Sequence, residues 1–323
     1  MRFIVRAVAA ALLVGPLALA APAVAQSGQP IRILYGFAAG SAGDLLARLV
    51  AERMQATTGQ SVVVENRVGA SGRLAIMSVK NGPTDGSMVF ISPNGPLAIT
   101  PIADPSTGYD PIADFAPISQ LVTFDFSVAV SASSPAKTIK DLAPWLKENP
   151  DKAAYGTPGA GTNLHFMAIA FSNAAQVPLR AVHYRGSAPA LNDVVANQLP
   201  MMFTPLSDQI EQHRTGKVRI LASAGDKRSP FAPDVPTFQE SGYAVRANGW
   251  YSAFASSKTP PEVIARLNKA MVEAVNTPSV KERLATLAFE TTGTSPEALA
   301  ASLKQEIETW RPIVKASGYK PGD

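Results

Sequence analysis

Short apolar runs and longer segments with apolar residues at helical spacing alternate along the chain from residue 31 onward. Residues 31–37, "IRILYGF", predict a strand, and residues 44–59, "DLLARLVAERMQATTG", predict a helix that stops at Gly59. The same reasoning predicts strands at 61–67, 87–93, 118–131, 153–157, 179–186, 199–206, 218–225 and 249–256, and helices at 73–81, 138–150, 162–175, 188–198, 208–216, 260–276, 278–288 and 296–317. This alternation predicts an α/β fold with largely parallel sheets and helices on both faces.

Two long apolar strands, around 120–130 and 250–255, have the character of crossovers between two lobes. With two crossings, the C-terminal helices return to the first lobe. We therefore expect lobe one to comprise 26–123 and 249–323, and lobe two to comprise 124–248. Such a strand pair can serve as a hinge, and ligands of α/β sheets bind where strands end, so we expect a cleft between the lobes.

The N-terminal residues 1–25 have the pattern of an export signal. Arg2 and Arg6 precede a short apolar run that ends in the small-residue pattern Ala23-Val24-Ala25. We expect cleavage after Ala25 and a periplasmic protein of about 298 residues (323 minus 25). The chain contains no cysteine, which excludes disulfides, thiolate chemistry and a lipid-anchored N-terminus.

Charge adds little to this picture. The formal net charge of +4 falls to about +2 when the two arginines of the signal are removed, and the remaining charges are scattered. No long basic cluster is present, so we do not expect nucleic-acid binding.

Four predicted strands end in turns of small residues, at 36–44, 92–96, 156–163 and 185–189. The first two turns belong to lobe one and the last two to lobe two. Glycine and alanine let a ligand approach the main chain closely, and a helix that follows such a turn directs free N–H groups at one point. Four such turns around one cleft predict a binding site for an anion.

The turn "GTPGAGTN" at 156–163 does not fit the nucleotide motifs. A P-loop requires a lysine, which the turn lacks. A dinucleotide fingerprint fits Gly159 and Gly161 but has Leu164 in place of the third glycine, and the next strand lacks an acidic residue at its end. A carboxylate, which needs only a few N–H and hydroxyl donors, is the anion that this turn favours.

The sequence does not predict an enzyme or a metal site. "AGSAG" at 39–43 is one residue short of the G-x-S-x-G nucleophile elbow, because Ala39 replaces the first glycine, and it follows the first strand. His165, His183 and His213 lack the spacing of metal ligands. We expect no catalytic residue, no metal and no cofactor.

Single polar residues allow two interpretations each. Asp44 is either a first-turn acid of its helix or a ligand contact, and Asp208 is either a cap or the partner of a ligand amine or hydroxyl. His165 either contacts ligand or packs in the core. Arg185 either binds a carboxylate or forms a structural ion pair, and Phe37 either lines the pocket or belongs to the core.

Several segments together resemble the Bug family, the TctC-like periplasmic receptors of tripartite tricarboxylate transporters. They include "GFAAGSAGDLLARLVAERM", "GQSVVVENRVGASG", "YGTPGAGTNLHFMAIAF", "HYRGSAPALNDVVANQLPMMF" and "DVPTFQESG", and the resemblance covers nearly the whole chain after the signal. It implies a type II periplasmic-binding-protein fold, with two Rossmann-like lobes joined by a two-strand hinge. It also implies that the lobes close over a small organic acid, whose carboxylate is held by loops at the strand ends, partly through ordered water.

The resemblance also implies which residues contact the ligand. They are Phe37, Ala38, Ala39, Gly40, Ser41, Ala42, Ser92 and Asn94 in lobe one, and Thr157, Gly159, Ala160, Gly161, Thr162, His165, Arg185, Gly186, Ser187, Ala188 and Asp208 in lobe two. One departure concerns the first loop, where the family's proline and paired glycines are replaced by Ala39, Gly40 and Ser41.

From these observations we expect a monomeric periplasmic receptor for a dicarboxylate or for an aromatic or amino-acid anion. Its partner is either the inner-membrane subunits of a tripartite tricarboxylate transporter or, as the alternative, a membrane histidine kinase to which it signals. The sequence does not distinguish these partners.

Overall fold

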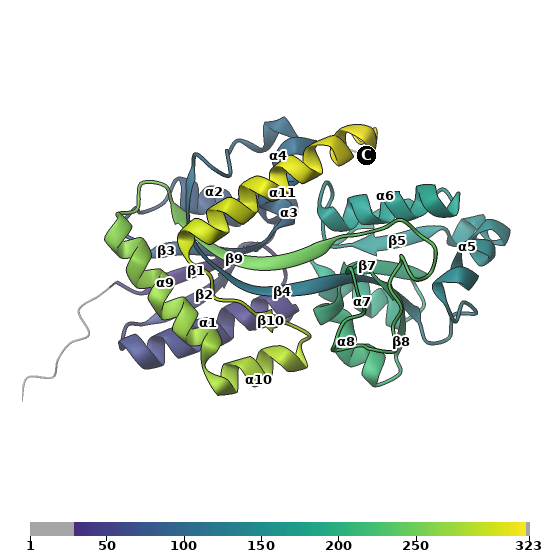
Figure 1. Ribbon diagram of the computed structural model, residues 1–323, viewed down its shortest axis with the longest axis horizontal. Coiled ribbons are helices and arrows are strands. Elements are labelled where there is room, and N and C mark those ends of the chain that lie inside the picture. Colours follow the sequence, from purple (N-terminus) through teal and green to yellow (C-terminus); the bar gives the residue numbers. More distant parts are fainter. Residues whose placement is uncertain (1–28, 321–323) are drawn as a thin grey trace, which may run out of the picture.

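The computed structural model describes residues 29–320, and the predicted export signal at 1–25 lies outside this range (Figure 1). The fold is α/β with two lobes, as the sequence predicts. The sheet is mixed and not largely parallel, because the two long strands in the middle of the molecule pair antiparallel with their neighbours. The strands form one continuous path in the order β2-β1-β3-β9-β4-β7-β5-β6. None of the helices within the described range is long and apolar enough to cross a membrane.

Lobe one is built on three parallel strands. The strand β1 (Ile31–Tyr35) lies between β2 (Val62–Asn66) and β3 (Met88–Pro93), and β9 (Asn248–Ser256) pairs antiparallel with β3. The helices of this lobe are α1 (Ala42–Thr58), α2 (Arg73–Lys80), α9 (Pro261–Asn276), α10 (Pro278–Thr286) and α11 (Pro296–Ala316). The last three follow β9, so the C-terminal part of the chain completes the lobe that the N-terminal part begins (Figure 1).

Lobe two repeats this arrangement with the middle of the chain. The strand β5 (Ala154–Thr157) lies parallel to β6 (Arg180–His183) and to β7 (Met201–Pro205). The strand β8 (Val218–Ser223) pairs with β4. The helices are α5 (Ile139–Glu148), α6 (Asn163–Ala175), α7 (Ser187–Val195) and α8 (Leu206–Arg214).

The 17-residue strand β4 (Phe115–Ser131) belongs to both lobes. Its first part pairs antiparallel with β9 as far as Asp125, opposite Asn248, and from Phe126 onward it pairs with β7 and β8. The two strands predicted to join the lobes are thus β4 and β9, which run side by side through the middle of the molecule (Figure 1). The residue at which one lobe ends and the other begins stays a prediction.

The segment 93–117 differs from its prediction. The sequence predicts a loop rich in proline and aspartate, but the structure has α3 (Gly95–Ala98), α4 (Thr100–Ala103) and the 3₁₀ helix η2 (Pro105–Thr107). Each of these begins with a proline in its first two positions, where the missing N–H is not needed, so proline there starts a helix and does not break one.

Three other short elements have no counterpart in the prediction. They are the 3₁₀ helices η1 (Ala70–Gly72) and η3 (Pro150–Lys152) and the two-residue strand β10 (Glu290–Thr291), which pairs with β4. Elements of two or three residues are too short to show a periodic pattern.

Candidate ligand-binding site between the lobes

A narrow cavity lies where the loops of the two lobes meet. Its walls come from lobe one, from lobe two and from the strands that join them. The lining residues are Tyr35, Phe37, Ser41, Pro93, Pro96, Phe126, Pro158, Thr162, Asn163, Leu164, Gly186, Ser187, Pro205, Asp208 and Tyr251. We refer to this space as the interlobe cavity.

Four helices of nine or more residues begin at the interlobe cavity. The residues that precede their first turns are Ser41 for α1, Thr162 for α6, Gly186 for α7 and Pro205 for α8, and all four line the cavity. Only Ser41 caps its helix with a side chain, whereas α6, α7 and α8 have no side-chain cap. Helix N-termini carry unpaired N–H groups and a partial positive charge, so these walls favour an anion.

The described residues that line the cavity include no lysine, arginine or histidine, and Asp208 is their only carboxylate. One Asp208 oxygen accepts the N–H of Ala42 at 2.7 Å, and the Ser187 hydroxyl also donates to this carboxylate. Burial raises the pKa of Asp208, and these two hydrogen bonds offset the rise only in part. A bound anion would therefore be held by main-chain donors, next to a buried acid.

Aromatic rings form one wall. The rings of Tyr35 and Phe37 lie 5.7 Å apart, and the hydroxyl groups of Tyr35 and Tyr251 lie 3.4 Å apart. Gly43 makes this packing possible, because a Cβ at this position would lie 2.3 Å from the Tyr35 hydroxyl and 2.6 Å from the Tyr251 ring. The tyrosines can contact the start of α1 only because residue 43 has no side chain.

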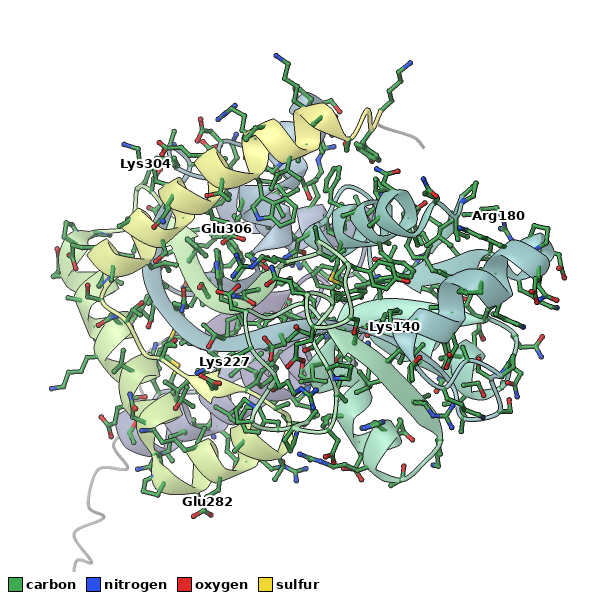
Figure 2. The ribbon with its side chains drawn as sticks, turned by 45° about the vertical axis from the view of Figure 1, so that its right-hand side comes forward. Lys140, Arg180, Lys227, Glu282, Lys304 and Glu306 are labelled. Carbon is green, nitrogen blue, oxygen red and sulfur yellow. The ribbon has the colours of Figure 1, made fainter. Side chains whose placement is uncertain are left out.

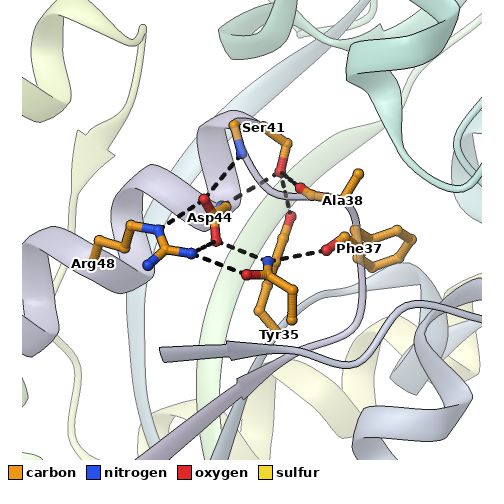
Figure 3. Close-up of polar contacts among 8 residues, drawn as sticks. Tyr35, Phe37, Ala38, Ser41, Asp44 and Arg48 are labelled. Carbon is orange, nitrogen blue, oxygen red and sulfur yellow. Dashed lines mark hydrogen bonds and ion pairs between the residues drawn. The ribbon is translucent and has the colours of Figure 1, made fainter. Parts of the chain in front are cut away.

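The first loop of lobe one is held by a polar network around Asp44 (Figure 3). Its carboxylate accepts the N–H of Gly40 at 3.0 Å, two bonds from Arg48 at 3.0 Å and one from Asn66 at 2.8 Å. Burial alone would raise the pKa of Asp44, but these donors outweigh burial and hold the pKa below its ordinary value. Asp44 thus serves the loop as a first-turn acid and does not line the cavity, which matches the first of its two interpretations.

Ser41 connects this loop to the cavity wall. Its hydroxyl donates to the Ala38 carbonyl at 3.1 Å and lies 3.3 Å from the Tyr35 hydroxyl, and it also caps α1. These contacts are those of a structural serine, with no histidine among them.

The two lobes touch on both sides of the interlobe cavity. Besides the bond from Ala42 to Asp208, the N–H of Ala38 donates to the Arg185 carbonyl at 3.2 Å. On the other side, the Asn163 amide donates to the Asn94 amide oxygen at 2.8 Å. The structure is therefore that of a closed arrangement of the lobes.

The predicted site residues fall into four groups. Phe37, Ser41, Thr162, Gly186, Ser187 and Asp208 line the interlobe cavity. Gly40, Ala42 and Ala188 line a groove at one mouth, between α1, α7, α8 and α10. Gly159, Ala160 and Arg185 line a second groove, at the other mouth. Ala38, Ala39, Ser92, Asn94, Thr157, Gly161 and His165 line none of these three spaces.

Two of the non-lining residues have clear structural contacts. Asn94 is fully buried in lobe one beneath α11, and His165 accepts the N–H of Gly161 at 3.2 Å and packs against Tyr319. For His165, the packing interpretation describes its position in the closed arrangement.

Nine of the lining residues are not among the predicted ligand contacts: Tyr35, Pro93, Pro96, Phe126, Pro158, Asn163, Leu164, Pro205 and Tyr251. Asn163 and Leu164 are the first residues of a helix that follows a predicted turn, so the rule that free N–H groups lie in the first turn could have found them. Phe126 and Tyr251 lie within apolar strands and carry no local signal. Only the pairing of β4 with its neighbours brings them to the cavity.

Two α/β lobes that are joined by two long strands and enclose a cavity where they meet are typical of solute-binding proteins. Within residues 29–320, no group of three or more histidine, aspartate or glutamate side chains could hold a metal ion.

Comparison with known proteins gives the family. Residues 46–319 match the model of the tripartite tricarboxylate transporter family receptor, TctC, and the chain belongs to this family. The predicted resemblance is confirmed, and because the family consists of binding proteins, the prediction that the chain is no enzyme is confirmed too.

Solved structures agree with this result. The periplasmic binding protein BugD is 32% identical, with a TM-score of 0.86 over 90% of this chain and 98% of that one. MatC from Rhodopseudomonas palustris with bound malate is 28% identical, with a TM-score of 0.84 over 88% and 98%. Rpa4515 from R. palustris with adipate is 29% identical, with a TM-score of 0.86 over 90% and 98%.

Proposed function

We propose that this protein, exported to the periplasm with cleavage after Ala25, binds a small organic carboxylate in the interlobe cavity and delivers it to an inner-membrane tripartite tricarboxylate transporter. The observation that carries the carboxylate assignment is the convergence of the uncapped starts of α6, α7 and α8 on a cavity whose described lining has no cationic side chain. An anion there accepts hydrogen bonds from first-turn N–H groups that no capping side chain satisfies.

The solved relatives support a ligand with two carboxylates. MatC was solved with malate and Rpa4515 with adipate, both of which are dicarboxylates. In this chain, two grooves adjoin the interlobe cavity: one shares Ser41 and Asp208 with its lining, and the other shares Phe37 and Pro158. A chain with an acid group at each end could place one carboxylate in the cavity and extend the other into a groove.

Asp208 affects which class of carboxylic acid the interlobe cavity favours as a ligand. A buried carboxylate beside a bound anion is unfavourable unless a proton lies between them. A ligand hydroxyl or ammonium group supplies that proton and a hydrogen bond to Asp208. We therefore propose that 2-hydroxy or 2-amino acids bind more tightly than the corresponding unsubstituted acids.

Binding and lobe closure are coupled in this proposal. The cavity wall joins Ser41 and Phe37 of lobe one to Ser187 and Asp208 of lobe two. A ligand that touches both sides binds the closed form better and shifts the population toward it, and the transporter can then recognise that form.

Calorimetric titration tests the carboxylate assignment. Malate, succinate and adipate serve as the acids, and succinamide serves as a neutral control of the same shape. We expect heat of binding for at least one acid, tighter binding of malate than of succinate, and none for succinamide. Binding of succinamide with no binding of any acid would contradict the proposal.

Two variants of Ser187, the first residue of α7, isolate the contribution of a single main-chain donor. Ser187→Ala removes the hydroxyl and keeps the N–H, whereas Ser187→Pro removes both, and proline is tolerated at the first position of a helix. Because a hydrogen bond to a charged group contributes about 1.5–3 kcal/mol, we expect Ser187→Pro to bind at least about tenfold more weakly than Ser187→Ala. Equal affinities would show that this N–H does not hold the ligand.

A further inference from the structure

Glu306 is a partly buried carboxylate on α11 and does not line the interlobe cavity. Figure 2 shows it on the side of α11 that faces the rest of the molecule, whereas the exposed Lys304 lies on the outer side. One Glu306 oxygen accepts the side-chain N–H₂ of Asn94 at 2.5 Å, and the other accepts the indole N–H of Trp250 at 2.5 Å. Burial raises its pKa to about 7, although Asn94, Trp250 and Trp310 all donate to it.

These contacts determine the orientation of the Asn94 side-chain amide, that is, which way its N–H₂ group and its oxygen point. Its N–H₂ group faces two acceptors, the Glu306 carboxylate and the Asn248 carbonyl at 3.0 Å. Its oxygen therefore points the other way, toward lobe two, where it accepts the N–H₂ of Asn163 at 2.8 Å. Asn94 is fully buried and Asn163 is 2% exposed, so an amide turned the wrong way would leave donors facing donors without water to satisfy them.

The contact between Asn94 and Asn163 is also where α6 meets lobe one. Asn163 is the first residue of α6 and lines the interlobe cavity, so this contact places one of the uncapped helix starts. Farther along α11, the ring of Trp310 lies 6.3 Å from that of Phe166 in the same α6. The C-terminal helix therefore touches lobe two where the ligand-binding N–H groups begin, and Figure 1 shows its end above α6.

We propose that Glu306 is a positioning residue for ligand capture, because it fixes the Asn94 amide so that lobe one presents an acceptor to Asn163 and thereby favours the closed lobes. The inference rests on the proposed function in one respect only, that closure accompanies binding. Glu306 itself contacts no ligand.

The absence of cysteine makes closure measurable by distance labelling. Lys140→Cys on α5 and Glu282→Cys on α10 place spin labels on exposed positions of opposite lobes, as Figure 2 shows. Pulsed electron–electron double resonance measures the distance between the two labels. The distance distribution gives the fractions of closed and open protein, both without ligand and with adipate. Glutamine at 306 offers one acceptor oxygen to the N–H groups of Asn94, Trp250 and Trp310, so we expect Glu306→Gln to lower the ratio of closed to open protein about fivefold. Glu308→Gln makes the same charge change on an exposed position of α11, and we expect it to leave the ratio unchanged.

A second substitution separates positioning from a merely structural role. Asn163→Asp exchanges the donor that faces Asn94 for an acceptor. If Glu306 holds the Asn94 amide in place, Asn163→Asp lowers the closed-to-open ratio about fivefold in the otherwise unchanged protein. In the Glu306→Gln background the Asn94 amide can turn and donate to the new carboxylate, so the same substitution lowers the ratio clearly less. Equal losses in both backgrounds, or no loss from Asn163→Asp alone, would overturn the proposal.

The outcomes also separate this inference from the proposed function. Should adipate fail to change the distances, the ratio in the ligand-free protein still compares the variants. Should Glu306→Gln fail to fold in a thermal melt, Asn163→Asp can still overturn the proposal, because it leaves α11 untouched. A closed fraction that is unaffected by Asn163→Asp would show that the orientation of the Asn94 amide does not control closure.

Discussion

Gly43→Ala is expected to lower both the stability of the protein and its affinity for ligand. The new Cβ would lie 2.3 Å from the Tyr35 hydroxyl and 2.6 Å from the Tyr251 ring, and both side chains are buried. Overpacking of this kind costs about 1–3 kcal/mol, so we expect a thermal midpoint roughly 5 °C lower. Because the two tyrosines form a wall of the interlobe cavity, we also expect at least about tenfold weaker binding in a calorimetric titration.

The closest of these contacts can be relieved separately. Tyr35→Phe removes the hydroxyl that the new methyl group would meet, so the double variant Gly43→Ala/Tyr35→Phe should melt above Gly43→Ala. If the two variants melt together, collision with the Tyr35 hydroxyl is not the cause of the loss.

Gly95→Ala is expected to separate affinity from stability. The new Cβ would lie 2.9 Å from the Asn163 amide oxygen and 3.2 Å from the Thr162 Cβ, both of which belong to lobe two. Alanine is a better helix former than glycine, so α3 itself is not harmed. We expect the thermal midpoint to change little and the affinity to fall about tenfold, because a smaller fraction of the protein can close.

Gly216 provides a control, because its substitution should lower stability and leave ligand affinity unchanged, which is the reverse of what we expect for Gly95→Ala. Gly216 has φ +72° and no neighbour within 4 Å of a Cβ, so Gly216→Ala should lower the melting temperature through backbone strain and leave the affinity unchanged. A large stability loss from Gly95→Ala with unchanged affinity would contradict the assignment of Gly95 to the closing contact.

Much of the fold could be predicted because its elements are long and periodic. The helix α1 and the strands β1, β4 and β9 each have a clear apolar pattern, and two long apolar strands suffice to predict a hinge between lobes. The segment 93–117 could not be predicted, since its helices are only four residues long and proline marks both turns and helix starts.

Apart from Asp208, which the family resemblance indicates, the candidate site could be predicted only where it consists of turns. Ser41, Gly186 and Ser187 stand in small-residue turns that open helices, and the structure places them in the cavity wall. Tyr251 belongs to the site because β9 pairs with β3 and β4, and Glu306 meets Asn94 across 212 residues of chain. Contacts of this kind depend on how distant elements pack, and no local pattern indicates them.

In the proposed mode of binding, main-chain N–H groups at the starts of α6 and α7 hold the carboxylate of the ligand. Amide NMR of the ¹⁵N-labelled protein during titration with malate or adipate observes these groups one by one. We expect the amide protons of Leu164 and Ser187 to move downfield on saturation, as a charged acceptor requires, and to exchange more slowly with water. Saturation of a bound acid that leaves both amides unmoved, while amides outside the interlobe cavity shift, would contradict this mode of binding.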